Sequence, residues 1–273
     1  MRLDQLAINS VSVSGDLETK IAAFQSAGFQ NVEWALGDVH QYLQTHSLDD
    51  LKRLHDAHEL RCIGGFEIGL QAFSTLVERV FNQQRLLENA RILNALGATT
   101  MVVGTDGPND EELDDEKRFK VLSGAFGEVA SRLQPLNITL CLEFNWSPIV
   151  KSLRTAVEVA RRSEMSNVGV LFDPAHYHCT PSKFEHINAD SVAFIRHVHV
   201  EDMADKPGEL TNCNSDRVLP GRGCLDLKAL LGALEKHGYA GYFAIEMFSD
   251  ALWQMPARQA AALMYESLLP LCE

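Results

Sequence analysis

The chain has 273 residues, of which 46% are hydrophobic and 22% are charged, and its formal net charge at pH 7 is −13. This length can bury a large core and matches the roughly 250 residues of a single α/β barrel. The acidic balance disfavours a protein that binds the phosphate backbone of nucleic acid, because such contacts need clustered Lys and Arg.

The amino terminus lacks the charged segment and apolar run of a signal peptide, and no apolar stretch approaches the roughly 20 residues of a membrane-spanning helix. The six cysteines are spread out without a C-x-x-C pair, which disfavours a disulfide framework or a thiolate zinc site. We therefore expect a cytoplasmic protein that binds neither nucleic acid nor membrane. The sequence leaves open whether it forms a homo-oligomer.

Apolar runs typical of buried strands alternate with helical patterns along the whole chain. The expected strands cover residues 6–11, 31–36, 61–66, 99–104, 139–143, 168–173, 194–202 and 242–246. Helices are expected at residues 16–24, from a capping box at 47–50, at 77–96, after 115, around 156, 184 and 230, and at 257–269.

Eight strand–helix units predict a parallel sheet closed into a (β/α)8 TIM barrel, with residues 1–273 forming a single domain. An open, doubly wound sheet is the alternative architecture. The first strand is not followed by a G-x-G-x-x-G motif, which argues against a dinucleotide-binding sheet.

Four consecutive strands end with side chains of the kind that bind metals, namely Glu143, Asp173, His199 and Glu246. The carboxyl ends of all strands in a parallel barrel face one side, so these residues are expected to converge at one mouth. Carboxylates that share a pocket repel one another, and a divalent cation removes that repulsion. Three carboxylates and one imidazole suit Mn²⁺, Mg²⁺ or Co²⁺, and Zn²⁺ is also compatible with them.

His176 follows Asp173 by three residues and can reach the mouth without binding the metal. We expect it to bind substrate or to handle a proton. His178 and His197 are weaker candidates, and His197 is expected to lie deeper in the barrel than His199. The aromatic residues that either wall the pocket or pack in the core are Trp34, Phe66, Trp146 and Trp253.

At these residues the chain resembles the xylose isomerase-like barrel superfamily of sugar isomerases and epimerases, and within it the inosose (2-keto-myo-inositol) isomerase family. The resemblance is dense between residues 138 and 250. Its most specific element is the loop at 216–227, Asp-Arg-Val-Leu-Pro-Gly-Arg-Gly-Cys-Leu-Asp-Leu. The other motifs are Leu-Glu-Phe at 142–144, Asn-Val-Gly-Val-Leu-Phe-Asp at 167–173, His-Tyr-His at 176–178, His-Val-His at 197–199, Glu-Asp at 201–202 and Glu-Met-Phe at 246–248.

The resemblance implies that Glu143, Asp173, His199 and Glu246 bind one divalent ion and that the two glutamates flank a keto-sugar or polyol ketone. It implies that Arg217 and Arg222 contact an anionic group or a hydroxyl.

An α-hydroxy ketone can lay both oxygens on the ion, which acidifies the adjacent C–H. Glu143 and Glu246 would then share the base and acid roles in isomerisation or epimerisation through a metal-bound enediolate. His176 is a third catalytic candidate.

The sequence leaves other functions open. A dehydratase would expel a β-hydroxyl from the same enediolate, an endonuclease-type phosphodiesterase would need more histidines and a basic surface, and a sugar-binding barrel would need no catalysis. Related epimerases often carry an Arg six residues after the metal His, where this chain has Asp205. Related 3-dehydroshikimate dehydratases can carry a His where this chain has Asn145. Both differences favour a cyclic polyol ketone or another sugar.

Overall fold

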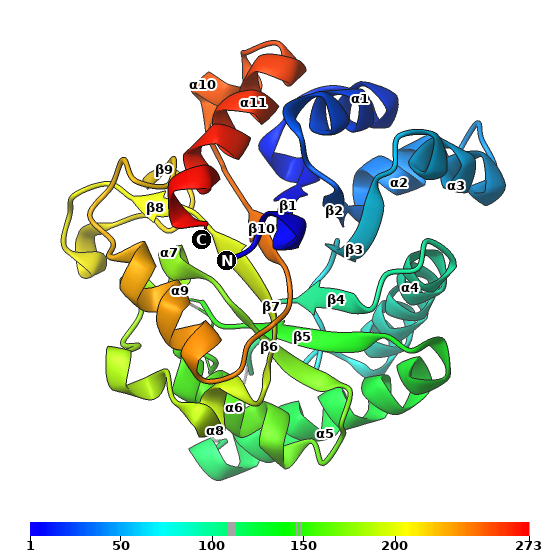
Figure 1. Ribbon diagram of the computed structural model, residues 1–273. Coiled ribbons are helices and arrows are strands. Elements are labelled where there is room, and N and C mark those ends of the chain that lie inside the picture. Colours follow the sequence, from blue (N-terminus) through cyan, green and yellow to red (C-terminus); the bar gives the residue numbers. More distant parts are fainter. Residues whose placement is uncertain (109–112, 146, 148, 273) are drawn as a thin grey trace.

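The protein is a closed barrel of eight parallel strands surrounded by helices, as a computed structural model of residues 1–108, 113–145, 147 and 149–272 describes it (Figure 1). The strand order around the barrel is β1-β10-β7-β6-β5-β4-β3-β2. The predicted (β/α)8 TIM barrel is therefore confirmed. The barrel strands are β1 (Leu6–Asn9), β2 (Asn31–Ala35), β3 (Arg61–Phe66), β4 (Thr100–Val103), β5 (Thr139–Glu143), β6 (Val168–Phe172), β7 (Ile195–Val200) and β10 (Phe243–Ile245).

Helices connect the strands on the outside of the barrel, and several begin with the caps that the sequence offers. Asp16 accepts a hydrogen bond from the Thr19 amide, and Ser47 and Asp50 form the predicted capping box. The helices are α1 (Leu17–Ala27), α2 (Leu36–Tyr42), α3 (Leu48–Ala57), α4 (Leu76–Ala95), α5 (Asp115–Leu133), α6 (Leu153–Arg162), α7 (Pro174–Cys179), α8 (Ala189–Val192), α9 (Leu227–Lys236), α10 (Asp250–Trp253) and α11 (Ala257–Leu268).

The structure differs from the expected elements in several places. Helix α2 begins at Leu36, the last residue of the expected second strand, and neither α2 nor α10 was expected. The first strand ends at Asn9, because the Asn9 side chain accepts a hydrogen bond from the Val11 amide and starts a 3-10 turn. The helix expected around residue 184 is a 3-10 turn (Phe184–His186) followed by the short helix α8. An unpredicted antiparallel pair, β8 (Asp202–Met203) and β9 (Arg217–Val218), stands beside the barrel.

Side chains alternate along each strand between the helical layer and the barrel interior. Ala7, Ile63 and Ala244 form a small apolar cluster separate from the main core, and Val102, Cys141 and Leu171 form another. Two residues beyond Ala7, Cys141, Leu171 and Ala244, the next inward positions carry polar groups. These are Asn9, Glu143, Asp173 and Glu246. The alternation that fills the barrel with apolar layers therefore places a polar layer at its carboxyl end.

All six cysteines are free thiols, and Cys62 and Cys141 are buried. Throughout the described ranges, we find no helix that combines the length and the apolar character needed to cross a bilayer.

Candidate metal and substrate site

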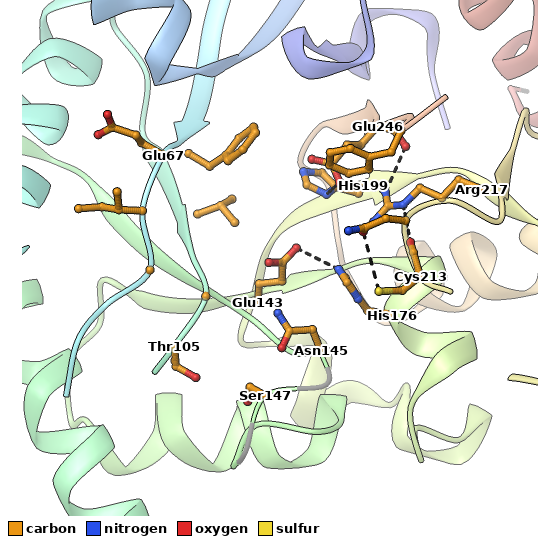
Figure 2. A pocket seen from close by; sticks show the side chains of 17 residues that line it. Glu67, Thr105, Glu143, Asn145, Ser147, His176, His199, Cys213, Arg217 and Glu246 are labelled. Atoms are coloured by element: carbon orange, nitrogen blue, oxygen red, sulfur yellow. Dashed lines mark hydrogen bonds and ion pairs between the residues drawn. The ribbon is translucent and has the colours of Figure 1, made fainter. Parts of the chain in front are cut away.

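A cavity of about 530 Å³ opens at the carboxyl end of the barrel, where Glu143, His176, His199, Arg217 and Glu246 line it (Figure 2). Asp173 is fully buried directly behind this wall, with its Oδ2 atom 3.4 Å from His199 Nδ1. The residues predicted from four separate strand ends therefore lie side by side.

The ligand atoms expected to hold a metal converge on the Nδ1 side of His199. Glu143, Asp173 and His199 each offer an atom within 4.8 Å of the others. Glu246 Oε2 lies 3.2 Å from His199 Nδ1, yet this nitrogen has no hydrogen-bond partner among the described residues. A buried nitrogen without a partner, facing carboxylate oxygens, fits the position of a divalent cation, and the oxygen-rich donor set suits a hard or borderline ion.

Arg217 supplies positive charge to the same cluster. Its Nη1 atom lies 2.9 Å from Glu246 Oε2 and 3.1 Å from Glu201 Oε2, and its Nη2 atom lies 3.1 Å from Asp173 Oδ2. Burial alone would raise the pKa of Asp173, but the nearby charges of Arg217 and His176 outweigh burial and hold that pKa well below its usual value. The predicted contact between Arg217 and substrate would therefore involve a guanidinium that already contacts three carboxyl groups.

The Asp-Pro-Ala-His sequence explains how His176 reaches the cavity. Asp173 caps α7 by accepting a hydrogen bond from the His176 amide at 2.8 Å, and Pro174 occupies the first helical position. His176 Nε2 then lies 3.3 Å from Glu143 Oε1. Burial would lower the pKa of His176, but Asp173 and Glu143 together raise it well above its usual value.

The Asp-Arg-x-x-Pro-Gly-x-Gly loop is closed by Asp202. Its Oδ2 atom accepts hydrogen bonds from the amides of Gly221 and Gly223 at 3.1 and 3.0 Å. A Cβ at Gly223 would overlap the Met203 carbonyl and the Asp202 carboxylate, so only glycine fits there. This tight loop delivers Arg217, in β9, to the buried cluster.

Other sequence-based candidates lie elsewhere. Arg222 is exposed and is not among the residues that line the cavity. Phe66 does line the cavity, whereas the Trp34 indole donates to His55 in the core and the Trp253 indole donates to the Val11 carbonyl. Trp146 lies outside the described residues. His178 contacts the Lys206 carbonyl, and His197 is buried in the barrel as expected.

Three buried polar residues that contact the cluster were not predicted: Asn9, Glu33 and Glu201. Glu201 accepts the Ala175 amide at 2.7 Å and pairs with Arg217, so it links β7, α7 and β9. Burial and the charge of Asp173 raise the pKa of Glu201 well above its usual value.

Glu33 contacts His199 from the opposite side to the carboxylates. The sequence signal for Glu33 is a charged residue within an apolar strand. Because Glu33 stands between Val32 and Trp34, the same pattern also fits a strand with one face exposed to solvent.

The fold and this convergence define a class of barrel enzyme, and a family comparison specifies it. The model of the xylose isomerase-like TIM barrel family matches residues 21–267, and the chain belongs to this family.

Individual relatives are more distant. The chain is 25% identical over 255 residues to an inosose isomerase of Bacillus velezensis, covering 90% of this chain and 88% of that protein. It is 26% identical over 287 residues to a 3-dehydroshikimate dehydratase of Pseudomonas aeruginosa, covering 98% of this chain but 42% of that protein. The crystal structure of an IolI protein with a bound zinc atom superposes with a TM-score of 0.88 at 22% identity, covering 98% of this chain and 97% of the other.

Proposed function

We propose that the protein is a divalent-metal-dependent isomerase or epimerase of an uncharged polyol ketone such as an inosose. The observation that carries this proposal is the placement of two glutamates, Glu143 and Glu246, in the wall of one cavity beside His199. Figure 2 shows both glutamates beside that imidazole at the cavity. Inosose isomerases among the relatives support the same substrate class.

We infer the roles of the residues from their positions. Glu143, Asp173, His199 and Glu246 would hold the ion, which when bound supplies the positive charge that polarises a substrate carbonyl and acidifies the neighbouring C–H. One glutamate would remove that proton and the other would return a proton to the adjacent carbon or to the opposite face. His176, 3.3 Å from Glu143, is placed to hold a substrate hydroxyl or to pass a proton to that carboxylate.

The charge of the cavity favours an uncharged substrate. Among the described residues that line it, Arg217 is the one Arg or Lys, and its guanidinium is already paired with three carboxylates. Glu67, on another wall, is held by Arg85 at 2.6 Å. A phosphate or carboxylate on the substrate would meet no free Arg or Lys in this part of the structure, which favours an inosose over 3-dehydroshikimate, a carboxylate, and over sugar phosphates.

The test measures exchange of the α-hydrogen of an inosose for solvent deuterium in D₂O. The exchange is followed by NMR with protein that is loaded with Zn²⁺ or Mg²⁺ and contains no Mn²⁺. Glu246→Gln and Glu143→Gln should each lower the exchange rate by at least about 100-fold, because general acid–base catalysis contributes that much. Glu209→Gln is the matched control and should exchange normally, because it removes an exposed carboxylate from the 3-10 turn Gly208–Leu210 that is not among the residues lining the cavity.

Exchange at the wild-type rate in both glutamate variants would end the proposal. A dehydratase is the second candidate, because dehydratases are among the relatives. It would release water and give a product with a new enone absorbance, whereas an isomerase or epimerase keeps the substrate's mass.

A further inference from the structure

We propose that Glu33 is a positioning residue that fixes the proton of His199 on Nε2 and thereby directs Nδ1 toward the metal. Glu33 is the third residue of β2, points into the barrel and is fully buried. Its Oε2 atom lies 2.8 Å from His199 Nε2 and 3.0 Å from His197 Nε2. The inference rests on the proposed metal site but not on any particular substrate.

The two nitrogens of His199 have different neighbours. A carboxylate can only accept hydrogen bonds, so a Glu33 oxygen at 2.8 Å selects the tautomer in which Nε2 carries the hydrogen. Nδ1 is then left with its lone pair, which points toward Asp173 Oδ2 at 3.4 Å and Glu246 Oε2 at 3.2 Å. A lone pair among carboxylate oxygens is favourable when a cation lies between them, and imidazole ligands in metal sites commonly donate their other N–H to a carboxylate.

Asn9 couples Glu33 to the other side of the site. Its Nδ2 atom donates to Glu33 Oε2 at 3.1 Å and to Glu246 Oε1 at 2.9 Å. The orientation of this amide is set by its own oxygen, which accepts the Val11 amide at 3.1 Å. The Asn9 amide therefore holds both Glu33, which contacts His199 Nε2, and Glu246, which faces His199 Nδ1, and so couples the positions of these two carboxylates.

A purely structural role explains Glu33 poorly. Its Oε1 atom is buried without a hydrogen-bond partner among the described residues, and a buried carboxylate with an unsatisfied oxygen costs free energy. An apolar side chain of the same length would fill the space without that cost.

Glu33, His197 and His199 are an alternative, second candidate metal site, since their ligand atoms lie within 4.8 Å of one another. That site would need His199 Nε2 as a lone-pair donor, and the two readings predict different metal stoichiometries.

The experiment compares metal binding and the His199 tautomer in four proteins: wild type, Glu33→Gln, Glu33→Met and Glu235→Gln. The last removes one carboxylate far from the cavity, where Glu235 pairs with the amino terminus, and controls for net charge. Zn²⁺ affinity is measured by competition with a chelator, stoichiometry by elemental analysis, and the tautomer by ¹⁵N NMR of the Zn²⁺-loaded protein labelled at histidine.

We expect one ion per chain and an Nε2-protonated His199 in the wild type and in Glu235→Gln. Glu33→Met should bind Zn²⁺ roughly 10- to 100-fold more weakly and lose the fixed tautomer, while its metal-free form stays folded. Glu33→Gln keeps an oxygen that accepts the Nε2 hydrogen, so it should recover most of the affinity.

Wild-type affinity and an unchanged tautomer in Glu33→Met would overturn the inference, as would two ions per wild-type chain that fall to one in this variant. Failure of the wild type to bind any metal would instead refute the proposed function, so the two failures are distinguishable.

Discussion

Arg217 is a buried guanidinium placed among Asp173, Glu201 and Glu246, and it keeps these carboxylates compatible when no other cation is close. Removing one partner of a buried ion pair is far more costly than removing an exposed charge. Arg217→Met should therefore lower the free energy of unfolding by about 3–5 kcal/mol at neutral pH, measured by urea denaturation of the metal-free protein. Because the pKa of Glu201 is raised, the loss should shrink as the pH falls and Glu201 takes up a proton.

The exposed Arg222 of the same loop provides the comparison. Arg222→Met should change the free energy of unfolding by no more than about 0.5 kcal/mol, as is usual for surface substitutions. Equal losses in the two variants would show that Arg217 does not compensate the buried carboxylates.

The sequence predicts individual residues of the site where the strand-end rule applies. Glu143 ends β5, Asp173 and Glu246 directly follow β6 and β10, and His199 is the next-to-last residue of β7. A parallel barrel gathers such strand ends at one mouth. Glu33 lies within β2, not at its tip, and Asn9 reads as an ordinary strand residue. Their importance depends on which interior position faces His199, and that is fixed by the register between neighbouring strands, which pairs Asn9 with Glu33.

The contact between strand β2 and helix α3 contains a pH-sensitive hydrogen bond. His55 Nε2 accepts the Trp34 indole N–H at 3.1 Å, and His55 Nδ1 contacts the Leu60 carbonyl at 2.7 Å. This pair of contacts requires the neutral imidazole, and burial lowers the pKa of His55 below its usual value of 6.5. As the pH falls through 6.5, the unfolded chain takes up a proton that the folded protein refuses, so this contribution to stability is present above that pH and lost below it.

His55→Gln should remove this dependence, because an amide can make both contacts but does not titrate. The difference in free energy of unfolding between wild type and His55→Gln, measured by urea denaturation, should be larger at pH 7.5 than at pH 5.5. The pKa values of His176 and His199 are raised, so the stability that these two residues contribute falls as the pH rises. Both residues are present in the wild type and in His55→Gln, so their contributions cancel in the difference. A difference that is constant or grows on acidification would contradict the assignment.

Elements with a strong local pattern are predictable from the sequence, and elements that depend on distant contacts are not. The alternation of apolar strands with capped helices such as α3 and α4 predicts the barrel. The pair β8–β9 has two residues in each strand, too few for a pattern, and its loop is held by Asp202. The short helix α7 begins at Pro174, and a proline at this point is compatible both with the end of a strand and with the start of a helix. The Asp173 cap is the feature that distinguishes a helix start from a simple strand end.

Over the whole molecule, barrel closure joins the two ends of the chain. β1 pairs directly with β10, and the amino-terminal ammonium lies 3.0 Å from Glu235 at the end of α9 (Figure 1). Phe29, after α1, packs edge-on against Tyr265 of α11 with ring centroids 5.0 Å apart. Because the proposed metal ligands come from β5, β6, β7 and β10, we propose that residues 1–273 unfold as one domain and that metal binding stabilises all of it.

Metal binding should therefore raise the unfolding temperature of the whole chain in a single transition. A ligand that binds only the folded state at 100 times its Kd stabilises that state by about 2.7 kcal/mol, and each kcal/mol raises Tm by roughly 2–4 °C in a protein of this size. Calorimetry of chelator-treated protein, with Mn²⁺, Mg²⁺, Co²⁺ or Zn²⁺ added back, should show this rise and rank the ions. Asp173→Asn keeps the α7 cap but weakens the proposed ligand set, so it should lose most of the rise. If Asp173→Asn responds to metal as the wild type does, the stabilising ion binds somewhere other than the barrel mouth.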